Sequence, residues 1–418
     1  MKNRKKKVHL RYDRIILLFI IIIILVFGLK LVLFRNKKVY MTNVIGLNIS
    51  SVEKSLEKYN LDIDITYKYD DNIPKDKVIS QSIDEDTEIM DGMKLSLVVS
   101  KGKIDLNKLR EDNINELGKV PIMMYHGIIN KKDSETDYIG GNVDKDGYNR
   151  TVESFRRDLE FYYSNGYRMI RLDDYVNGNI NVKYGYSPIV ITFDDGNPNN
   201  MKVLGKDDNG ELIIDENSAV GILESFKKKY PDYNVTATFF VNDYLFQQSK
   251  YNEEILRWLV KNGYTIGNHT KGHANFSKID ANKAQEVVAT VYQELDSILG
   301  TEYLHIVALP FGSPYSKTHA NYPYILKGNY NGYEYETEAA LRVGWEPELS
   351  PYHNDFDKTF LKRCRAYDNN GKEFDIEMVF KMLDKKRYIS DGNVDTIVVS
   401  SDNKDLVNNL FDKELIVY

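Results

Sequence analysis

The chain has 418 residues, of which 42% are hydrophobic and 12% aromatic, so it holds enough apolar material for a sizeable core and does not have the composition of a disordered protein. The formal net charge is −6, but residues 1–14 hold seven basic residues and one Asp, a charge of +6, which leaves −12 on the rest. This balance argues against nucleic-acid binding, which needs a basic surface. Cys364 is the single cysteine, so an intrachain disulfide is excluded.

The first feature along the chain is a long apolar stretch. Residues 15–34, IILLFIIIIILVFGLKLVLF, are apolar except for Lys30, and about 20 residues of helix match the hydrocarbon thickness of a bilayer. Basic residues are concentrated before this stretch, so we expect one transmembrane helix, a cytoplasmic tail over residues 1–14, and everything after residue 38 outside the cell. A cleaved signal peptide is the alternative, although the stretch is long for one and no A-x-A-like site follows it.

Residues 39–102 have the pattern of a small α/β domain. Ser50 and Glu53 form an expected capping box, followed by a helical face of Val52, Leu56 and Tyr59. Strand patterns follow in DIDITYK, KVISQS and MKLSLVVSKG. The pieces NVIGLNISSVEKSLEKYNLDI, VISQS and LSLVVSKGK resemble a PASTA module, the extracellular repeat of penicillin-binding proteins and bacterial serine/threonine kinases. The resemblance implies cell-wall binding or spacing, and a generic spacer without a ligand is the alternative.

The segment 103–118 is charged and lacks a strand pattern, so we interpret it as a linker. From residue 119 onward apolar stretches alternate with helical patterns. The clearest helical pattern covers 281–299, where Ala284, Val287, Val288, Val291, Tyr292, Leu295 and Ile298 form one stripe. Repeated strand and helix units predict a parallel sheet or barrel, whose active site lies at the carboxyl ends of the strands.

Two polar motifs end predicted strands of this region. ITFDDG places Asp194 and Asp195 at a strand end before Gly196, and YTIGNHTKGH places His269 and His273 at the end of another strand. A four-residue spacing lets both imidazoles reach one ion, and one carboxylate completes a site of two His and one Asp. Zinc suits these ligands, and iron, cobalt or nickel also fit. The second carboxylate is then free to take a proton from a water at the metal.

These motifs give residues 119 to about 400 a resemblance to the polysaccharide deacetylase family of carbohydrate esterases. TFDDG matches its first motif, HTKGH its His-Ser/Thr-x-x-His motif, and ALPFG part of its Arg-x-Pro-aromatic-Gly motif. The resemblance implies an α/β fold, an incomplete and distorted (β/α) barrel of about seven strands. It also implies that Asp194 is the catalytic base, that Asp195, His269 and His273 bind the metal, and that the backbone N–H of Phe311 helps to hold the oxyanion.

The chain departs from the family pattern at two places. The arginine that orients the base in the family falls on Ala308, and we consider Arg342 or Arg365 as its replacement. The family's late histidine, its general acid, should fall near TIVVSSD, where the chain has Ser400 and Ser401.

Other side chains are candidates for the missing acid and for the pocket wall. His126 or His353 could supply the missing proton, and His126 could equally be a hydrogen-bonded core residue. His305 and His319 are expected to be structural or exposed. Trp345 is a candidate for the family's aromatic pocket wall, and a packed core residue is the alternative.

The sequence therefore predicts a membrane-anchored, extracellular, metal-dependent deacetylase. Its expected cofactor is a divalent metal ion, with zinc first, and its expected partners are a cell-wall or surface polysaccharide and the membrane. Peptidoglycan is the first expected substrate and an exopolysaccharide of N-acetylglucosamine the second. The alternatives are a cell-wall glycan binder that keeps the metal but has lost turnover, and a structural or sensory wall protein that works through residues 39–102.

Overall fold

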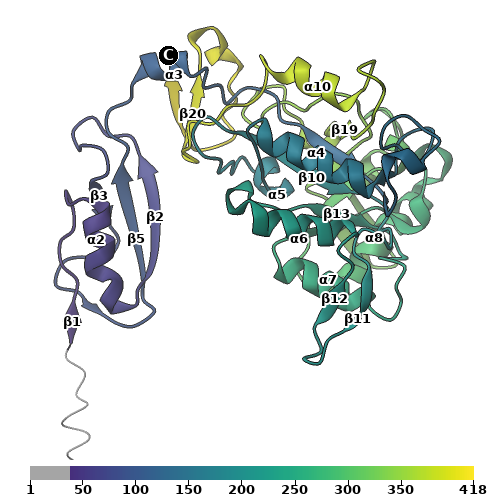
Figure 1. The fold of residues 1–418 in the computed structure, drawn as a ribbon, viewed down its shortest axis with the longest axis horizontal. Coiled ribbons are helices and arrows are strands. Elements are labelled where there is room, and N and C mark those ends of the chain that lie inside the picture. The colour runs from purple at the N-terminus through teal and green to yellow at the C-terminus, as the bar shows by residue number, and fades with distance from the viewer. Residues whose placement is uncertain (1–37) are drawn as a thin grey trace, which may run out of the picture. The chain divides into compact units, whose positions relative to one another are not determined.

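The structure is a computed structural model that describes residues 38–418 in two compact units (Figure 1). The first unit ends at Ile104, and the second covers Asp105–Tyr418. The predicted cytoplasmic tail and transmembrane helix, residues 1–14 and 15–34, lie outside the described residues. From residue 38 to the end of the chain, no helix is both long and apolar enough to cross a membrane.

The first unit is a small sheet with one helix packed on it. The central strand β5 pairs in parallel with β2 and antiparallel with β3, and β1 pairs antiparallel with β4. Its elements are β1 (Val39–Tyr40), α2 (Ile49–Leu56), β2 (Asp62–Lys68), β3 (Val78–Gln81), β4 (Glu88–Ile89) and β5 (Lys94–Ser100). The three predicted strands and the predicted helix are therefore present.

The N-cap of helix α2 lies two residues before the expected one, Ser50. The side chain of Asn48 accepts a hydrogen bond from the N–H of Ser50, so Asn48 is the N-cap and Ser50 lies inside the helix. Asn is as good a cap as Ser, and its position one residue before the apolar Ile49 decides the start. Val52 and Leu56 are buried as expected, in one cluster with apolar residues of β5.

The second unit is built on a sheet of parallel strands, as expected for an incomplete (β/α) barrel of about seven strands. The order is β18-β15-β14-β13-β10-β6-β19, and β9 pairs with β10 beside this path. The bounds are β6 (Ile122–Tyr125), β9 (Tyr167–Met169), β10 (Ser187–Phe193), β13 (Thr238–Val241), β14 (Thr265–Asn268), β15 (Ile306–Ala308), β18 (Ala339–Leu341) and β19 (Cys364–Arg365). Every residue of β10 is buried, because both faces of such a sheet are covered.

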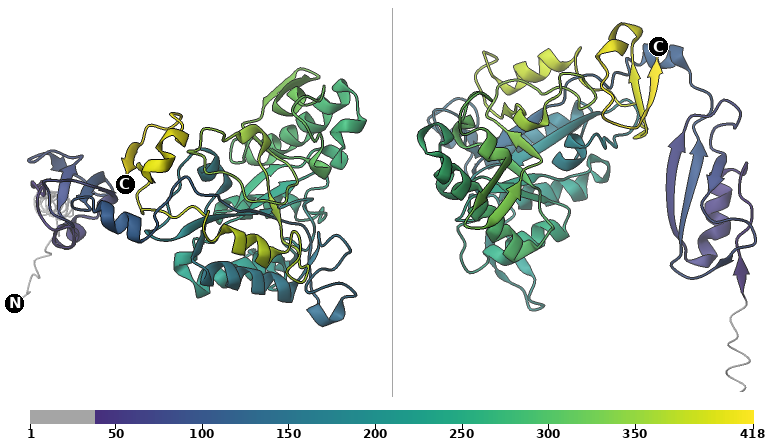
Figure 2. Two further views of the ribbon diagram at one scale, coloured as in Figure 1. Left: turned by 90° about the horizontal axis from the view of Figure 1, so that it is seen from above. Right: turned by 180° about the vertical axis from the view of Figure 1, so that it is seen from behind.

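Helices lie around these strands, which run through the middle of the second unit (Figure 2). They are α4 (Val152–Ser164), α5 (Leu172–Val176), α6 (Ala219–Lys229), α7 (Asn252–Lys261), α8 (Ala281–Leu299), α9 (Pro323–Leu326) and α10 (Ile376–Leu383). Helix α8 has the predicted bounds. The Asp280 side chain caps its first turn, Gly300 follows its last residue, and the predicted apolar stripe is buried.

Short strands outside the main sheet form separate pairs. Two pairs are antiparallel: β11 (Val203–Lys206) with β12 (Leu212–Ile214), and β16 (Lys327–Tyr330) with β17 (Tyr333–Glu336). Two pairs are parallel: β20 (Thr396–Val399) with β21 (Glu414–Val417), and β7 (Ile128–Ile129) with β8 (Arg150–Thr151). Strand β20 contains the TIVV segment in which the family's late motif was expected, and it pairs with β21 instead of joining the main sheet.

The segment predicted as a linker, 103–118, contains the short helix α3 (Leu106–Glu111). It also anchors to the second unit through Glu116, a fully buried carboxylate. Glu116 accepts hydrogen bonds from the Tyr388 hydroxyl at 2.9 Å and from the N–H groups of Val398 at 2.8 Å and Asp391 at 3.3 Å. Buried carboxylates need such partners, so this part of the segment is a fixed element of the second unit.

One isolated β-bridge connects the two edges of the sheet, at β18 and next to β19. Leu361, in the segment that leads into β19, pairs in parallel with Leu341 of β18. The strands thereby curve towards a barrel, and their carboxyl ends gather at one rim. At this rim Asp194 follows β10, His126 follows β6 and His269 follows β14. The fold thus brings residues far apart in sequence to one place.

Candidate active site

A cavity of about 300 Å³ lies at the carboxyl ends of the strands. Its walls include charged, aromatic and apolar side chains from six different segments: His126, Tyr148, Asn149, Asp194, Asp195, Asn197, His269, His273, Leu309, Phe311 and Val343. Five of these residues, namely Asp194, Asp195, His269, His273 and Phe311, were predicted from the sequence as site residues. The structure therefore brings all the predicted site residues together.

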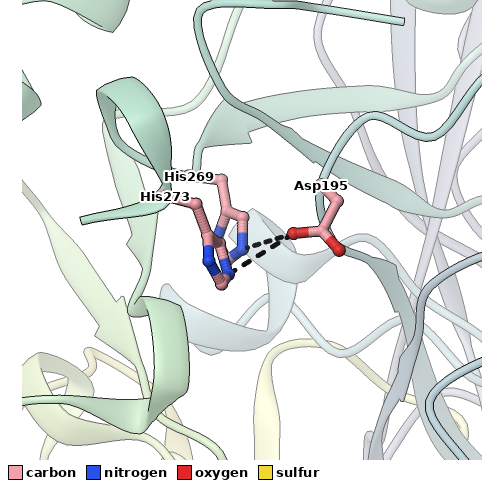
Figure 3. A group of neighbouring side chains, drawn as sticks. All are labelled: Asp195, His269 and His273. Carbon is pink, nitrogen blue, oxygen red and sulfur yellow. Dashed lines mark ion pairs between the residues drawn. The ribbon is translucent and has the colours of Figure 1, made fainter. Parts of the chain in front are cut away.

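Asp195, His269 and His273 form the polar centre of this cavity (Figure 3). One oxygen, Oδ1 of Asp195, lies 3.2 Å from Nε2 of His269 and 3.5 Å from Nε2 of His273. One ligand atom from each residue lies within 4.8 Å of the others. Two imidazole nitrogens and one carboxylate oxygen converging in this way form a set that suits zinc or a similar divalent ion.

The hydrogen bonds of His269 test whether a cation fits this centre. Its Nδ1 lies 2.9 Å from the carbonyl oxygen of Ala308, which can only accept, so Nδ1 carries the hydrogen. In the neutral ring, Nε2 then carries a lone pair that faces the Asp195 carboxylate. This buried atom has no hydrogen-bond partner among the residues that the structure describes. Two acceptors facing each other favour a positive ion between them. The residues therefore fit a metal, held by the orientation that Ala308 gives to His269.

The pKa values of His269 and Asp195 are shifted by the charges in this centre. Burial alone would lower the pKa of His269, but the carboxylates of Asp194 and Asp195 outweigh it and raise that pKa. For Asp195, burial alone would raise the pKa, but a protonated His269 ring, whose Nε2 would then donate a hydrogen bond to the carboxylate, outweighs burial and brings that pKa well below its usual value. The two carboxylates therefore favour positive charge at His269, whereas burial and the neighbouring His269 lower the pKa of His273.

Backbone conformations of positive φ place these side chains. Asp195 (φ 74°), Thr270 (φ 64°), His273 (φ 51°) and Phe311 (φ 60°) all have left-handed conformations that ordinary residues rarely adopt. The positive φ of Asp195 departs from the strand conformation, which would send neighbouring side chains to opposite faces, and both carboxylates line one cavity. Gly196 completes this turn with φ 58°, and a Cβ there would lie 2.0 Å from the carbonyl oxygen of Leu245. Such strain is characteristic of functional sites.

Asp194 forms a buried ion pair with Arg363. Its Oδ1 and Oδ2 accept hydrogen bonds from Nη1 and Nη2 of Arg363, both at 2.7 Å. Arg363 is fully buried and Asp194 is 2% exposed. Burial alone would raise the pKa of Asp194, but the Arg363 charge, with help from His269, outweighs it and lowers that pKa. The carboxylate is therefore ionised at neutral pH and fixed in orientation by a two-pronged contact.

The arginine on Asp194 corrects the sequence prediction. We considered Arg342 or Arg365 as the replacement for the arginine that the family has at the position of Ala308, and neither contacts Asp194. Arg363 does so because β19 pairs with β6, which in turn pairs with β10, so its side chain reaches across the sheet. The signal in the sequence was the alternation of basic and small residues in KRCRA, which is too short to identify a strand reliably.

The other histidines considered from the sequence differ in their position relative to the cavity. His126 lines the cavity, its ring lies 4.9 Å from that of Tyr148, and its Nδ1 is buried without a hydrogen-bond partner in the described chain. Burial lowers the pKa of His126. His353 does not line the cavity and forms a backbone bridge with Val407. His305 is exposed, and its ring stacks on Tyr303 at 4.9 Å.

Two families match parts of this chain. The family model for the PASTA domain matches residues 39–101, and the family model for polysaccharide deacetylase matches residues 182–325. The second match includes Asp194, Asp195, His269, His273 and Phe311, and it ends before Arg363. No curated protein matches the chain.

Solved structures of three deacetylases or carbohydrate esterases are similar to the chain. The Streptococcus pyogenes deacetylase PplD in complex with acetate is 17% identical, with 62% of this chain and 97% of that chain covered and a TM-score of 0.44. A de-N-acetylase from Aggregatibacter actinomycetemcomitans is 12% identical, with 59% and 94% covered and a TM-score of 0.38. A family 4 carbohydrate esterase from Bacillus anthracis is 20% identical, with 55% and 84% covered and a TM-score of 0.25.

The metal centre can be tested by removing each histidine. The purified full chain should contain one divalent ion per molecule, and His269→Ala or His273→Ala should lose it, because each removes one of three ligands. Elemental analysis measures the content, and circular dichroism checks that the fold survives. His305→Ala, a change at an exposed histidine outside the cavity, serves as control and should keep the ion. Unchanged metal content in both site variants would reject the assignment.

The ion pair between Arg363 and Asp194 can be tested by a double-mutant cycle. Arg363→Met should reduce the free energy of unfolding by about 3–5 kcal/mol, because it leaves a buried carboxylate without its partner. Adding Asp194→Asn should recover part of this loss, so that the two changes are not additive. As a matched control, Arg171→Met removes a partly exposed pair with Asp173 and should cost at most about 1 kcal/mol. Strict additivity in chemical denaturation would contradict the pairing.

Proposed function

The chain carries a polysaccharide deacetylase domain and a PASTA domain, and from this premise we propose that it is a membrane-anchored, extracellular, metal-dependent polysaccharide N-deacetylase. The observation that carries the proposal is the pair of neighbouring aspartates with different surroundings. Asp195 faces two histidines, and Asp194 faces an arginine. One cavity thus combines a cation-binding set with a separate, ionised carboxylate, which is what metal-assisted hydrolysis of an amide requires.

Asp195, His269 and His273 would hold the metal. When bound, a divalent metal ion supplies a Lewis acid that polarises a carbonyl and makes a neighbouring water more acidic. In this role Asp195 contributes its negative charge, and His269 and His273 contribute neutral imidazole nitrogens. The Ala308 carbonyl keeps the hydrogen of His269 on Nδ1, so Nε2 stays available as a ligand atom.

Asp194 would act as the general base. It takes a proton from the water that attacks the acetamide carbonyl carbon, and Arg363 keeps it ionised and oriented before the reaction. A carboxylate with a lowered pKa is a weak base, so the reaction depends on a more acidic water than bulk water. The arrangement therefore divides the work between the two aspartates and explains why a single carboxylate is not enough.

The apolar part of the cavity wall suits the acetyl group, and the turn at Phe311 suits its developing charge. Leu309, Phe311 and Val343 provide apolar surface for the methyl group. In the turn at Phe311, the backbone hydrogen bonds are donated by Gly312 to Leu309 and by Ser313 to Pro310. The backbone N–H of Phe311 is proposed to donate to the oxyanion that forms when water adds to the carbonyl.

The departing nitrogen must receive a proton before the C–N bond breaks. The residues around the cavity include no equivalent of the family's late histidine, since Ser400 and Ser401 do not line it. We propose that His126 passes to the nitrogen the proton that Asp194 took from water, because its ring lies in the cavity wall and its Nδ1 has no other hydrogen-bond partner in the described chain. Burial favours the neutral ring, which can accept that proton and give it up again. The net reaction converts acetamide and water into acetate and an amine.

Peptidoglycan is the proposed substrate, with an exopolysaccharide of N-acetylglucosamine as the second candidate. The presence of a PASTA domain on the same chain supports a cell-wall polymer, and the apolar stretch at residues 15–34 with basic residues before it supports an anchor that holds both domains outside the cell. An inactive glycan binder is the alternative function. The arginine on Asp194 favours the enzyme, because a binder has no use for a buried, oriented base.

The orientation in the membrane gives one prediction. Protease added to intact protoplasts should digest the PASTA and deacetylase domains, because the basic residues before residue 15 keep the short N-terminus inside. Immunoblotting with antibodies to each domain follows the loss. A cytoplasmic marker protein serves as control for intact membranes, and full protection of both domains until lysis would reject the proposed location.

Acetate release tests the enzyme directly. The full chain with peptidoglycan or chito-oligosaccharides should release acetate, and Asp194→Asn should lower the rate by about 10²- to 10⁴-fold while the metal stays bound, because the change removes only the base. Asp207→Asn, at an exposed carboxylate outside the cavity, is the matched control and should leave the rate unchanged.

The same assay tests His126. His126→Ala should be slow with its metal intact, because the amine then relies on water for its proton. A wild-type protein that holds metal and binds glycan but releases no acetate from any N-acetylated polymer would contradict the enzyme and leave the glycan binder.

A further inference from the structure

Two side chains at the end of β13 contact both halves of the metal-binding set without belonging to it. Strand β13 lies between β10 and β14 in the sheet, and Asn242 and Asp243 are the first two residues after it. Strand β10 leads into Asp195, and β14 leads into His269 and His273. Because parallel neighbours end at the same edge of a sheet, the end of β13 can reach the segments on both sides.

Asn242 bonds to the backbone of the carboxylate residue of the set. Its Nδ2 donates a hydrogen bond to the carbonyl oxygen of Asp195 at 3.2 Å, and its Oδ1 accepts one from the N–H of Tyr244 at 2.9 Å. Asn242 is only 7% exposed. A buried amide with both ends paired has one orientation, so Asn242 ties the backbone of Asp195 to the end of β13.

Asp243 bonds to the backbone immediately before His273. Its Oδ1 accepts a hydrogen bond from the N–H of Gly272 at 2.6 Å, and an ionised acceptor makes such a bond strong. The turn needs support, because Gly272 (φ 63°) and His273 (φ 51°) are left-handed. Thr270, with φ 64° and ψ 149°, lies in a region that is almost restricted to glycine. Such a turn persists only where surrounding contacts hold it.

His273 depends on this backbone contact more than His269 does. The ring of His269 is buried, and its Nδ1 is bonded to the carbonyl oxygen of Ala308. The side chain of His273 is 34% exposed, and apart from the approach of its Nε2 to Asp195, no polar atom of residues 38–418 bonds its ring. The ring rests against that of Phe311, with 4.5 Å between the ring centres. The position of its Nε2 therefore follows the backbone of the turn, which Asp243 holds.

We propose that Asn242 and Asp243 are positioning residues of the metal centre, which fix the backbones of Asp195 and His273 relative to each other. The inference rests on the proposed function, because it concerns the metal centre of that function. Both side chains act through the backbone of a neighbouring segment, and neither supplies an atom to the set of three ligands. Ligands that are held in place before the ion arrives lose less freedom on binding, so both contacts raise the affinity for the ion.

Calorimetric titration of the metal-free full chain with zinc tests Asp243. Asp243→Ala should raise the Kd for zinc by about 10- to 100-fold, because the N–H of Gly272 loses its acceptor. Asp243→Asn removes the charge but keeps an acceptor oxygen, so it should recover most of this loss. If the negative charge alone attracted the ion, the two variants would lose affinity equally, and that result would overturn the positioning role of Asp243.

The same titration tests Asn242 against a matched control. Asn242→Ala should weaken zinc binding over the same range, because the carbonyl of Asp195 loses its donor. Asp105 also accepts backbone N–H groups, at the start of α3 and outside the cavity, so Asp105→Ala should keep the wild-type Kd. Circular dichroism checks each fold, and if Asn242→Ala does not fold, the Asp243 variants decide the question. Unchanged zinc affinity in both alanine variants would overturn the proposal.

Hydrogen exchange in metal-free protein separates this inference from the proposed function. The amide of Gly272 should be protected in the wild type and in Asp243→Asn, and it should exchange faster in Asp243→Ala. If the wild type binds no divalent ion, the metal centre of the proposed function fails, and the exchange rates still show whether Asp243 holds the turn. Equal exchange of this amide in the wild type and in Asp243→Ala would contradict the inference.

Discussion

The buried ion pair between Arg363 and Asp194 is the constraint on which the rest of the site depends. Taking both charges out of water is expensive, and only a two-pronged geometry with hydrogen bonds at 2.7 Å to each oxygen offsets that cost. The pair joins β19 to β10 across β6, so the sheet must be assembled before the site exists. Because Arg363 fixes Asp194, Asp195 is the carboxylate that faces His269 and His273.

The left-handed backbone at Asp195 completes this separation. A strand would send Asp194 and Asp195 to opposite faces, and the turn at Gly196 keeps both within one cavity. The unpartnered Nε2 of His269 and the nearby Asp195 oxygen then create a local field that favours a cation. The two aspartates therefore differ in their surroundings, although they are chemically identical, and this difference supports the proposed roles of ligand for Asp195 and base for Asp194.

Much of this arrangement could be predicted from the sequence. Helix α8 has a long amphipathic stripe with a cap at each end, so even its bounds were predictable. The strand ends that carry Asp194 and His269 were visible as apolar runs followed by polar motifs. Parallel strands place such ends together, which is why Asp195, His269 and His273 could be expected to meet at one place without coordinates.

Other features depend on tertiary contacts that local patterns do not contain. Strand β19 has only two residues, so nothing in KRCRA identifies Arg363 as the partner of a residue 169 positions earlier. Glu116 looks like an ordinary charged linker residue, and only the packing of residues 388–398 shows that it is buried. The first helix was misplaced by two residues because Asn48 and Ser50 are both good caps, and the neighbouring Ile49 decides between them.

The central claim is that a metal at Asp195, His269 and His273 is required for hydrolysis of an acetamide on a glycan. The most direct measurement is acetate release by the full chain after removal of metal with a chelator and again after addition of one equivalent of zinc. The account predicts that release stops without metal and returns with it, with no change in the fold. Acetate release at an unchanged rate in fully metal-free protein would contradict it.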